Sequence, residues 1–352
     1  MQISKKSSLG IVLAGAVSVG ALAGCGSSSG PADTADGTFS ASVDEACAAA
    51  ADESGALNYV ASTDAAVFAE EIKPFTAAHP DIEVKYTNLR STDASQTLLA
   101  EAQARHGLSF DALAGELPGF QPLFDQGMVL DVDWAALGMA DDLLYRDGDG
   151  TAFRNYRLIT GIGYNTELVS QDELPDTWEE LVDPKWAGRV IVDPRGSYIG
   201  RIAPAFGKDE TIEWFQRFMD VDKPLIIQGA TASAQKVIAG EALLTTSAAD
   251  ANVRESQEAG APLGIKYLDY VPTSDYHTLV MKDTPRPNTA ACFLGWLGGP
   301  EGRAQKEKYE FQKNDSTPSE VPPGATLVLT DTPEALQIAS ETSDALAKIM
   351  AG

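Results

Sequence analysis

Four short hydroxyl-rich turns in this 352-residue chain carry residue types that can bind an anion. Each turn follows a predicted strand or opens a predicted helix, and its hydroxyls are expected beside unpaired backbone N–H groups at a positive helix end. The candidate binding residues are Ser62 and Thr63, Ser91 and Ser95, Ser197 and Tyr198, and Thr231 and Ser233. The competing interpretation of each turn is an ordinary helix cap, because Ser and Thr are common at that position.

A second group of polar residues follows other strand-like segments and is expected near the same site. Its members are Glu116, Asp250, Asn252 and Tyr276. Glu116 and Asp250 would suit a cation. Arg195 could face an anion, although a solvated surface position is the default for an arginine.

Signatures of catalysis are missing from the sequence. The histidines, His79, His106 and His277, do not pair at metal-binding helix spacing, and His277 alone lies in a probable strand near a predicted crossover. No Cys-x-x-Cys, His-Glu-x-x-His, P-loop or dinucleotide fingerprint occurs. The string Gly-x-Ser-x-Gly at 26–30 lacks the strand and helix that a nucleophile elbow needs. We therefore expect a binding protein with no catalytic residue and no cofactor; a secreted hydrolase is the alternative of a different class, and a bound metal stays undecided.

Alternating strands and helices must position these residues. Phe68, Ile72 and Phe75 share one helical face, and Thr332 with Pro333 predicts the start of a last helix. The predicted strands are 57–61, 82–86, 110–114, 189–192 and 242–246, and further predicted helices are 95–105, 209–219, 231–239 and 251–259. This β-α-β alternation predicts an α/β fold with mixed, mostly parallel sheets flanked by helices.

The N-terminus predicts secretion. Lys5 and Lys6 precede an apolar run of 14 residues at 9–22, shorter than the roughly 20 needed to cross a bilayer. Leu-Ala-Gly-Cys at 22–25 resembles a bacterial lipobox, which implies a signal peptide at 1–24 and lipidation of Cys25. The competing interpretation is an ordinary signal peptide with a chance Cys. Residues 25–40 lack large aliphatic side chains and predict a flexible tether.

Composition narrows the class of protein further. Hydrophobic content of 44% is normal for a globular protein and too low for a multispan membrane protein. A net charge of −25 argues against a nucleic-acid partner. The chain has two further cysteines besides Cys25, namely Cys47 and Cys292. In an oxidising compartment they could form a disulfide or stay as two buried thiols.

Several phrases resemble one protein family. The segment 177–189, Thr-Trp-Glu-Glu-Leu-Val-Asp-Pro-Lys-Trp-Ala-Gly-Arg, is similar to a phrase of bacterial ABC-transporter solute-binding proteins of the iron(III), aminoethylphosphonate, thiamine and polyamine group. Within it, Thr177 and Glu180 predict a capping box. Further phrases follow in the family's order at 163–166, 240–242, 260–262 and 285–291, so the resemblance covers about residues 55–315.

The resemblance implies a type II periplasmic-binding-protein fold with two lobes and two crossover strands as a hinge. By that analogy lobe one is 41–161 with 271–352, and lobe two is 162–270. The ligand would lie in the cleft at the carboxyl ends of strands, and the lobes would close around it. The implied protein is a monomer that delivers a small solute to ABC-transporter permease subunits. The lipid on Cys25 would hold it in the cell envelope, in the periplasm or at the outer face of the cytoplasmic membrane.

The hydroxyl-rich turns favour an organophosphonate or phosphate ester as the solute. Ferric-binding members of the family use adjacent tyrosines in the second lobe, and the corresponding stretch 245–252 contains no Tyr. Tyr267, Tyr270 and Tyr276 come later and are not adjacent. Ferric iron or an iron chelate is therefore the alternative, and a cationic polyamine is a third option.

Overall fold

The computed structural model describes residues 38–314 and 321–352. The predicted signal peptide, the acylated Cys25 and most of the predicted tether lie outside the described residues. Within the described ranges, no helix is long and apolar enough to cross a membrane.

The described strands form one mixed sheet in the order β2-β1-β3-β10-β5-β8-β6-β7, with β4 and β9 on β5 and β11 on β10. Parallel pairs join β1 to β2 and β3, and β6 to β7 and β8, while β10 and β5 run antiparallel to their neighbours in the main order. The strands are β1 Leu57–Ala61, β2 Val84–Asn88, β3 Ala112–Glu116, β4 Leu144–Asp147, β5 Gly150–Asn165, β6 Val190–Val192, β7 Leu225–Ile226, β8 Leu244–Ala249, β9 Leu263–Lys266, β10 Tyr270–Val280 and β11 Thr326–Val328. The predicted α/β class is confirmed.

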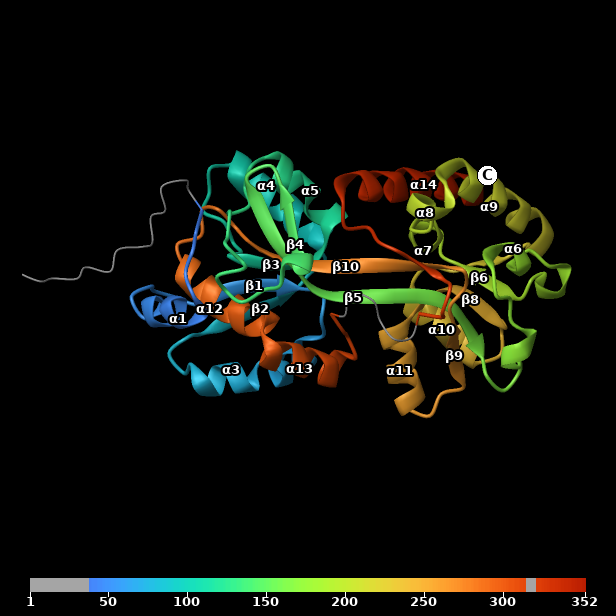
Figure 1. Cartoon of the computed structure of the whole chain (residues 1–352), viewed down its shortest axis with the longest axis horizontal. Coiled ribbons are helices and arrows are strands. Elements are labelled where there is room, and N and C mark those ends of the chain that lie inside the picture. The colour runs from blue at the N-terminus through green and yellow to red at the C-terminus, as the bar shows by residue number, and fades with distance from the viewer. Residues whose placement is uncertain (1–37, 315–320) are drawn as a thin grey trace, which may run out of the picture. The chain divides into compact units, whose positions relative to one another are not determined.

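Helices cover both faces of this sheet, with α4, α5 and α14 on one side and α3, α11 and α13 on the other (Figure 1). They are α1 Val43–Ala50, α2 Ala65–Glu71, α3 Lys73–Ala78, α4 Ser91–Gln103, α5 Leu117–Asp125, α6 Trp178–Leu181, α7 Ser197–Gly200, α8 Ala203–Phe206, α9 Lys208–Asp222, α10 Ala230–Ile238, α11 Asp250–Glu258, α12 Pro287–Gly298, α13 Pro300–Glu310 and α14 Pro333–Ala351. The helix predicted through Phe68 and Phe75 is broken at Ile72. Pro74 explains the break, because a proline ring clashes with the carbonyl four residues earlier.

Separate apolar clusters lie at the two ends of the sheet. One end buries Phe75, Phe293 and their neighbours, and the other buries Trp178 and Trp214. The helix α14, which we predicted with the first lobe, packs instead on α7, α8 and α9, with Leu346 inside the second cluster. Its apolar stripe therefore completes the core at the end of the sheet formed by β6, β7 and β8.

A disulfide joins Cys47 of α1 to Cys292 of α12, with Cα atoms 4.7 Å apart. Of the two alternatives left open by the sequence, the structure has the bridge. It crosses 245 residues of chain and ties the first helix to the buried α12.

We expect replacement of both cysteines by Ala to lower the free energy of unfolding by about 2–5 kcal/mol. Without the disulfide, the unfolded chain gains conformational entropy. Urea denaturation of the two proteins measures the difference. Reductant should move the wild-type midpoint toward that of the double variant and leave the double variant unchanged. Equal midpoints under oxidising conditions would contradict a stabilising bridge.

Candidate functional site

Three oxygen-bearing side chains stand in one row across β3, β10 and β5. Tyr276 of β10 is in register with Glu116 of β3 and with Tyr156 of β5. Residues paired across neighbouring strands project from the same face of a sheet. The two tyrosine rings are stacked with centroids 4.5 Å apart. The carboxylate and both phenols therefore gather at the end of β3.

The helix α7 brings a second set of polar groups to this row. A guanidinium nitrogen of Arg201 donates to Glu116 Oε1 at 2.7 Å, and Ser274 Oγ donates to the same oxygen at 2.5 Å. The Arg201 guanidinium also lies 5.9 Å from the centre of the Tyr198 ring. Gly196 precedes α7 with φ of 69°, a left-handed conformation that favours glycine. The Glu116–Arg201 pair thus joins the two ends of the sheet.

Burial and charge set the protonation of this cluster. Burial by itself would raise the pKa of Glu116, but Arg201 and the Ser274 hydrogen bond outweigh it and hold that pKa below its usual value. Burial raises the pKa of Tyr276, and the Glu116 charge adds to the effect. Burial also raises the pKa of Tyr156 and of Tyr198, in the latter case against Arg201. The phenols therefore stay protonated at neutral pH unless a bound cation displaces their protons.

Arg195 forms an ion pair with Asp193 and is not a solvated surface arginine. Its Nε and a terminal nitrogen donate to the carboxylate of Asp193 at 2.8 and 2.7 Å. The backbone N–H of Gly229, just before α10, donates to the same carboxylate at 2.8 Å. Burial opposes ionisation of Asp193, yet these bonds keep its pKa below the usual value.

The structure brings together four of the predicted site residues. Glu116 and Ser197 line one cavity of about 160 Å³ with Arg201 and Ser274. Tyr198 and Tyr276 interact electrostatically with Glu116 and Arg201. Sequence reasoning missed Tyr156, Arg201 and Ser274, because the strand register and the contact of α7 with β3 that bring them together are not visible in a single sequence.

Several predicted hydroxyls are engaged within the protein. Ser95 Oγ donates to the Gly119 carbonyl at 2.7 Å, and Ser233 Oγ donates to the Gly229 carbonyl at 2.9 Å. Both serines are buried, at 2% and 0% exposure, so they support local structure. Thr63 Oγ1 donates to the carboxylate of Glu310 at 3.1 Å. These three hydroxyls do not form the anion site that we predicted.

Of the remaining candidates, Ser91 packs against Gly115 and Gly119, beside Glu116, and the others are dispersed. Ser91 is the first residue of α4 and is half-buried, while Ser62, Thr231 and Asn252 are exposed. Asp250 Oδ1 accepts from the Ile159 backbone N–H at 3.3 Å, at the start of α11. His277 lies within β10 at 3% exposure, and burial lowers its pKa to about 4. The structure therefore places His277 in the buried interior, within strand β10.

The model of the bacterial extracellular solute-binding proteins matches residues 70–334. The chain belongs to this family. Members bind a solute outside the cytoplasm and deliver it to the permease of an ABC importer, and the family consists of binding proteins.

Solved structures confirm the type II periplasmic-binding-protein fold. Iron-bound HitA from Pseudomonas aeruginosa superimposes with a TM-score of 0.69 at 17% identity, covering 84% of this chain and 99% of that one. A ferric binding protein from Campylobacter jejuni gives 0.68 at 15% identity, covering 83% and 99%. Among curated proteins, iron uptake protein A1 of Synechocystis sp. (strain ATCC 27184 / PCC 6803 / Kazusa) is 34% identical over 105 residues. That aligned stretch is 28% of this chain and 29% of the relative.

We expect Arg201→Gln to raise the pKa of the Glu116 carboxyl, because burial then acts without its strongest opposing charge. Carbon-detected NMR titration of labelled glutamate measures this pKa. Arg217→Gln is the matched control, since its pair with Glu179 is more than half exposed and should contribute only about 0–1 kcal/mol. An unchanged Glu116 titration in Arg201→Gln would show that the ion pair does not form in solution.

Proposed function

We propose that this family member binds ferric iron as its cargo, with Tyr156, Tyr198, Tyr276 and Glu116 as the protein ligands. The observation that carries the proposal is the cross-strand row of a carboxylate and two phenols, with a third phenol close by on α7. Fe(III) is a hard cation, and phenolate and carboxylate oxygens are hard donors that match it.

The charges of this donor set support bare iron. Three phenolates and one carboxylate carry four negative charges, which is one more than the three positive charges of Fe(III). Arg201, which already contacts Glu116, supplies one positive charge beside them. A nearly neutral site costs less to bury than one with a net charge.

The three similar proteins reported above support iron, the alternative from the sequence, over an organophosphonate or phosphate ester, although one further solved neighbour, AfuA from Actinobacillus pleuropneumoniae, has fructose-6-phosphate bound. Both structural neighbours described above and the curated relative have names that refer to iron. The tyrosines differ from the adjacent pair that the family resemblance led us to seek in 245–252, because they come from β5, α7 and β10.

The proposal includes a division into two lobes that close on the cargo. One lobe is built around β1, β2 and β3 with α12 and α13, and the other around β6, β7 and β8 with α14. The strands β5 and β10 connect them. A monomer held to the membrane by a lipid on Cys25 remains our proposal for the mature protein.

Ferric nitrilotriacetate added to the purified protein should produce a visible tyrosinate-to-iron charge-transfer band. Tyr198→Phe should weaken the band and the affinity, whereas Tyr309→Phe, which lies on α13 outside the row, should change neither. Because the free phenols have raised pKa values, binding should release protons and strengthen as pH rises.

A thermal-shift panel provides the opposing test, because ligand binding raises the melting temperature by mass action. It contains ferric nitrilotriacetate, aminoethylphosphonate, glycerol phosphate and spermidine. Stabilisation by aminoethylphosphonate or glycerol phosphate, with no effect of iron and no band, would overturn the iron proposal in favour of an oxyanion cargo.

A further inference from the structure

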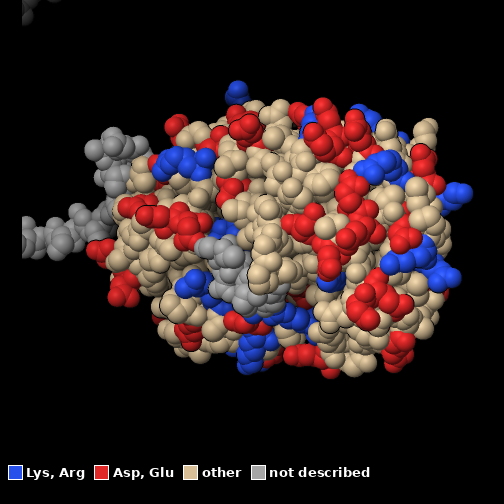
Figure 2. Space-filling model, turned by 45° about the vertical axis from the view of Figure 1, so that its right-hand side comes forward, with Lys and Arg blue, Asp and Glu red and all other residues tan. Residues whose placement is uncertain are grey.

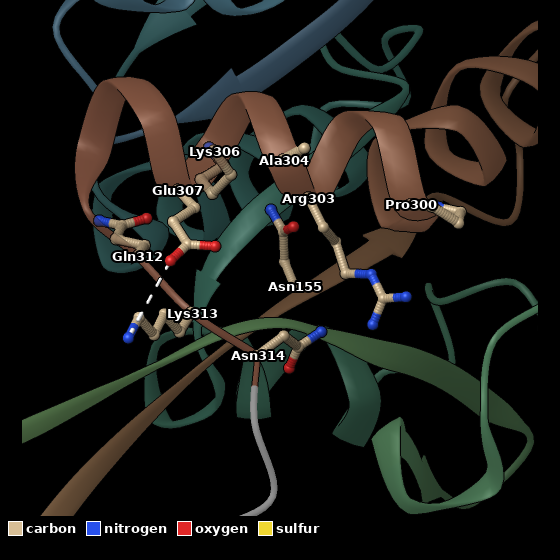
Figure 3. Close-up of a pocket in the computed structure, with 9 residues that line it drawn as sticks. All are labelled: Asn155, Pro300, Arg303, Ala304, Lys306, Glu307, Gln312, Lys313 and Asn314. Carbon is tan, nitrogen blue, oxygen red and sulfur yellow. Dashed lines mark ion pairs between the residues drawn. The ribbon is translucent and has the colours of Figure 1, made fainter. Parts of the chain in front are cut away.

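A second cavity, of about 370 Å³, lies between α13 and β5 (Figure 3). This volume falls in the range of roughly 300–1,000 Å³ that is common for small-ligand pockets. Its wall includes Asn155 of β5, Arg303 and Glu307 of α13, and the segment 312–314. None of the four proposed iron ligands lines it, so its lining is separate from the proposed iron site, although Lys306 of its wall lies 5.7 Å from the centre of the Tyr156 ring.

The side chain of Asn155 is the unusual feature of this cavity. It is 2% exposed, and neither its amide nitrogen nor its amide oxygen has a hydrogen-bond partner among the described residues. Figure 3 shows the amide rising from β5 toward α13, between the side chains of Arg303 and Glu307. An unpartnered buried amide destabilises the fold, and a leucine of similar size would avoid that cost. Packing therefore does not explain an asparagine at this position.

The charges around the cavity favour a singly charged anion. The Arg303 guanidinium forms no ion pair or hydrogen bond with the described residues. Its side chain lies beside Asn155 in the cavity wall (Figure 3). Lys313 lies 4.0 Å from Glu307, and the Lys306 ammonium is engaged by Glu71 at 3.0 Å and Glu310 at 2.8 Å. Arg303 is thus the one uncompensated charge among the described lining residues. Acidic side chains are spread over the face of the molecule that Figure 2 shows.

We propose that this cavity binds a small carboxylate that also carries a hydrogen-bond donor, as in an α-hydroxy acid. The Arg303 guanidinium can bind the carboxylate through two parallel hydrogen bonds, and Asn155 Nδ2 can donate a third. Asn155 Oδ1 then accepts a hydrogen bond from the ligand hydroxyl. That acceptor would repel a fully ionised phosphate, which has no donor to offer it.

Isothermal titration of the full chain with L-lactate tests the proposal, and propionate is the matched ligand without the hydroxyl. We expect lactate to bind more tightly than propionate. Arg303→Gln, at an exposed position of α13, should weaken lactate binding about tenfold or more through loss of a charge-assisted bond. The control Arg217→Gln should bind lactate as the wild type does.

Asn155→Leu separates a binding role from a structural one. Without ligand its melting temperature should equal or exceed that of the wild type, and it should lose the preference for lactate over propionate. Equal affinity for the two acids, no binding of lactate, or unchanged lactate binding in Arg303→Gln would each overturn the proposal. The tyrosinate-to-iron band should persist in Arg303→Gln, so this proposal and the iron proposal can fail independently.

Discussion

The buried ion pair between Arg157 of β5 and Asp275 of β10 holds the two long central strands in a single register. Both side chains are 1% exposed, and two hydrogen bonds of 2.5 Å join them. Such a pair adds little net stability, but separating its partners leaves an uncompensated buried charge. Tyr156 precedes Arg157 and Tyr276 follows Asp275, so the register that forms the ion pair also places the two phenols opposite each other. A slip of one residue would move them to opposite faces.

The choice between a cationic and an anionic cargo depends on which charges are already neutralised. Arg195 is paired with Asp193 and Arg201 with Glu116. Lys306 lies 5.7 Å from the centre of the Tyr156 ring, but Glu71 and Glu310 both contact it. Burial raises the pKa of Glu71 to about 7, against the opposing charge of Lys306. No described cation near the row is left over for an oxyanion, whereas phenols and a carboxylate gain a favourable partner in a metal ion.

The sequence predicted local structure better than the site. The strand at 57–61 and the Thr332 cap with Pro333 match the structure, because both depend on neighbouring residues. Thr177 caps α6 as predicted, although the Glu180 carboxylate bonds to the Asp176 N–H and so does not complete the capping box. Tyr156 could not be found in the same way, because its partners are 40 and 120 residues distant and meet it only through sheet register. Hydroxyls such as Ser95 misled us because a cap and a ligand contact use the same residue type.

If the two ends of the molecule move against each other as proposed, the position of α14 restricts that motion. Leu336, in its first turn, packs beside the cluster that contains Phe120 and Leu123, whereas Leu346 is buried in the cluster of Trp214. The helix therefore adds a third connection to the two crossover strands. Leu336 is only half-buried, so loss of its contact would expose little apolar surface, while removal of Leu346 would open a core. Any opening of the cleft would therefore carry α14 with β6 and β8, and would separate it from the first cluster at Leu336.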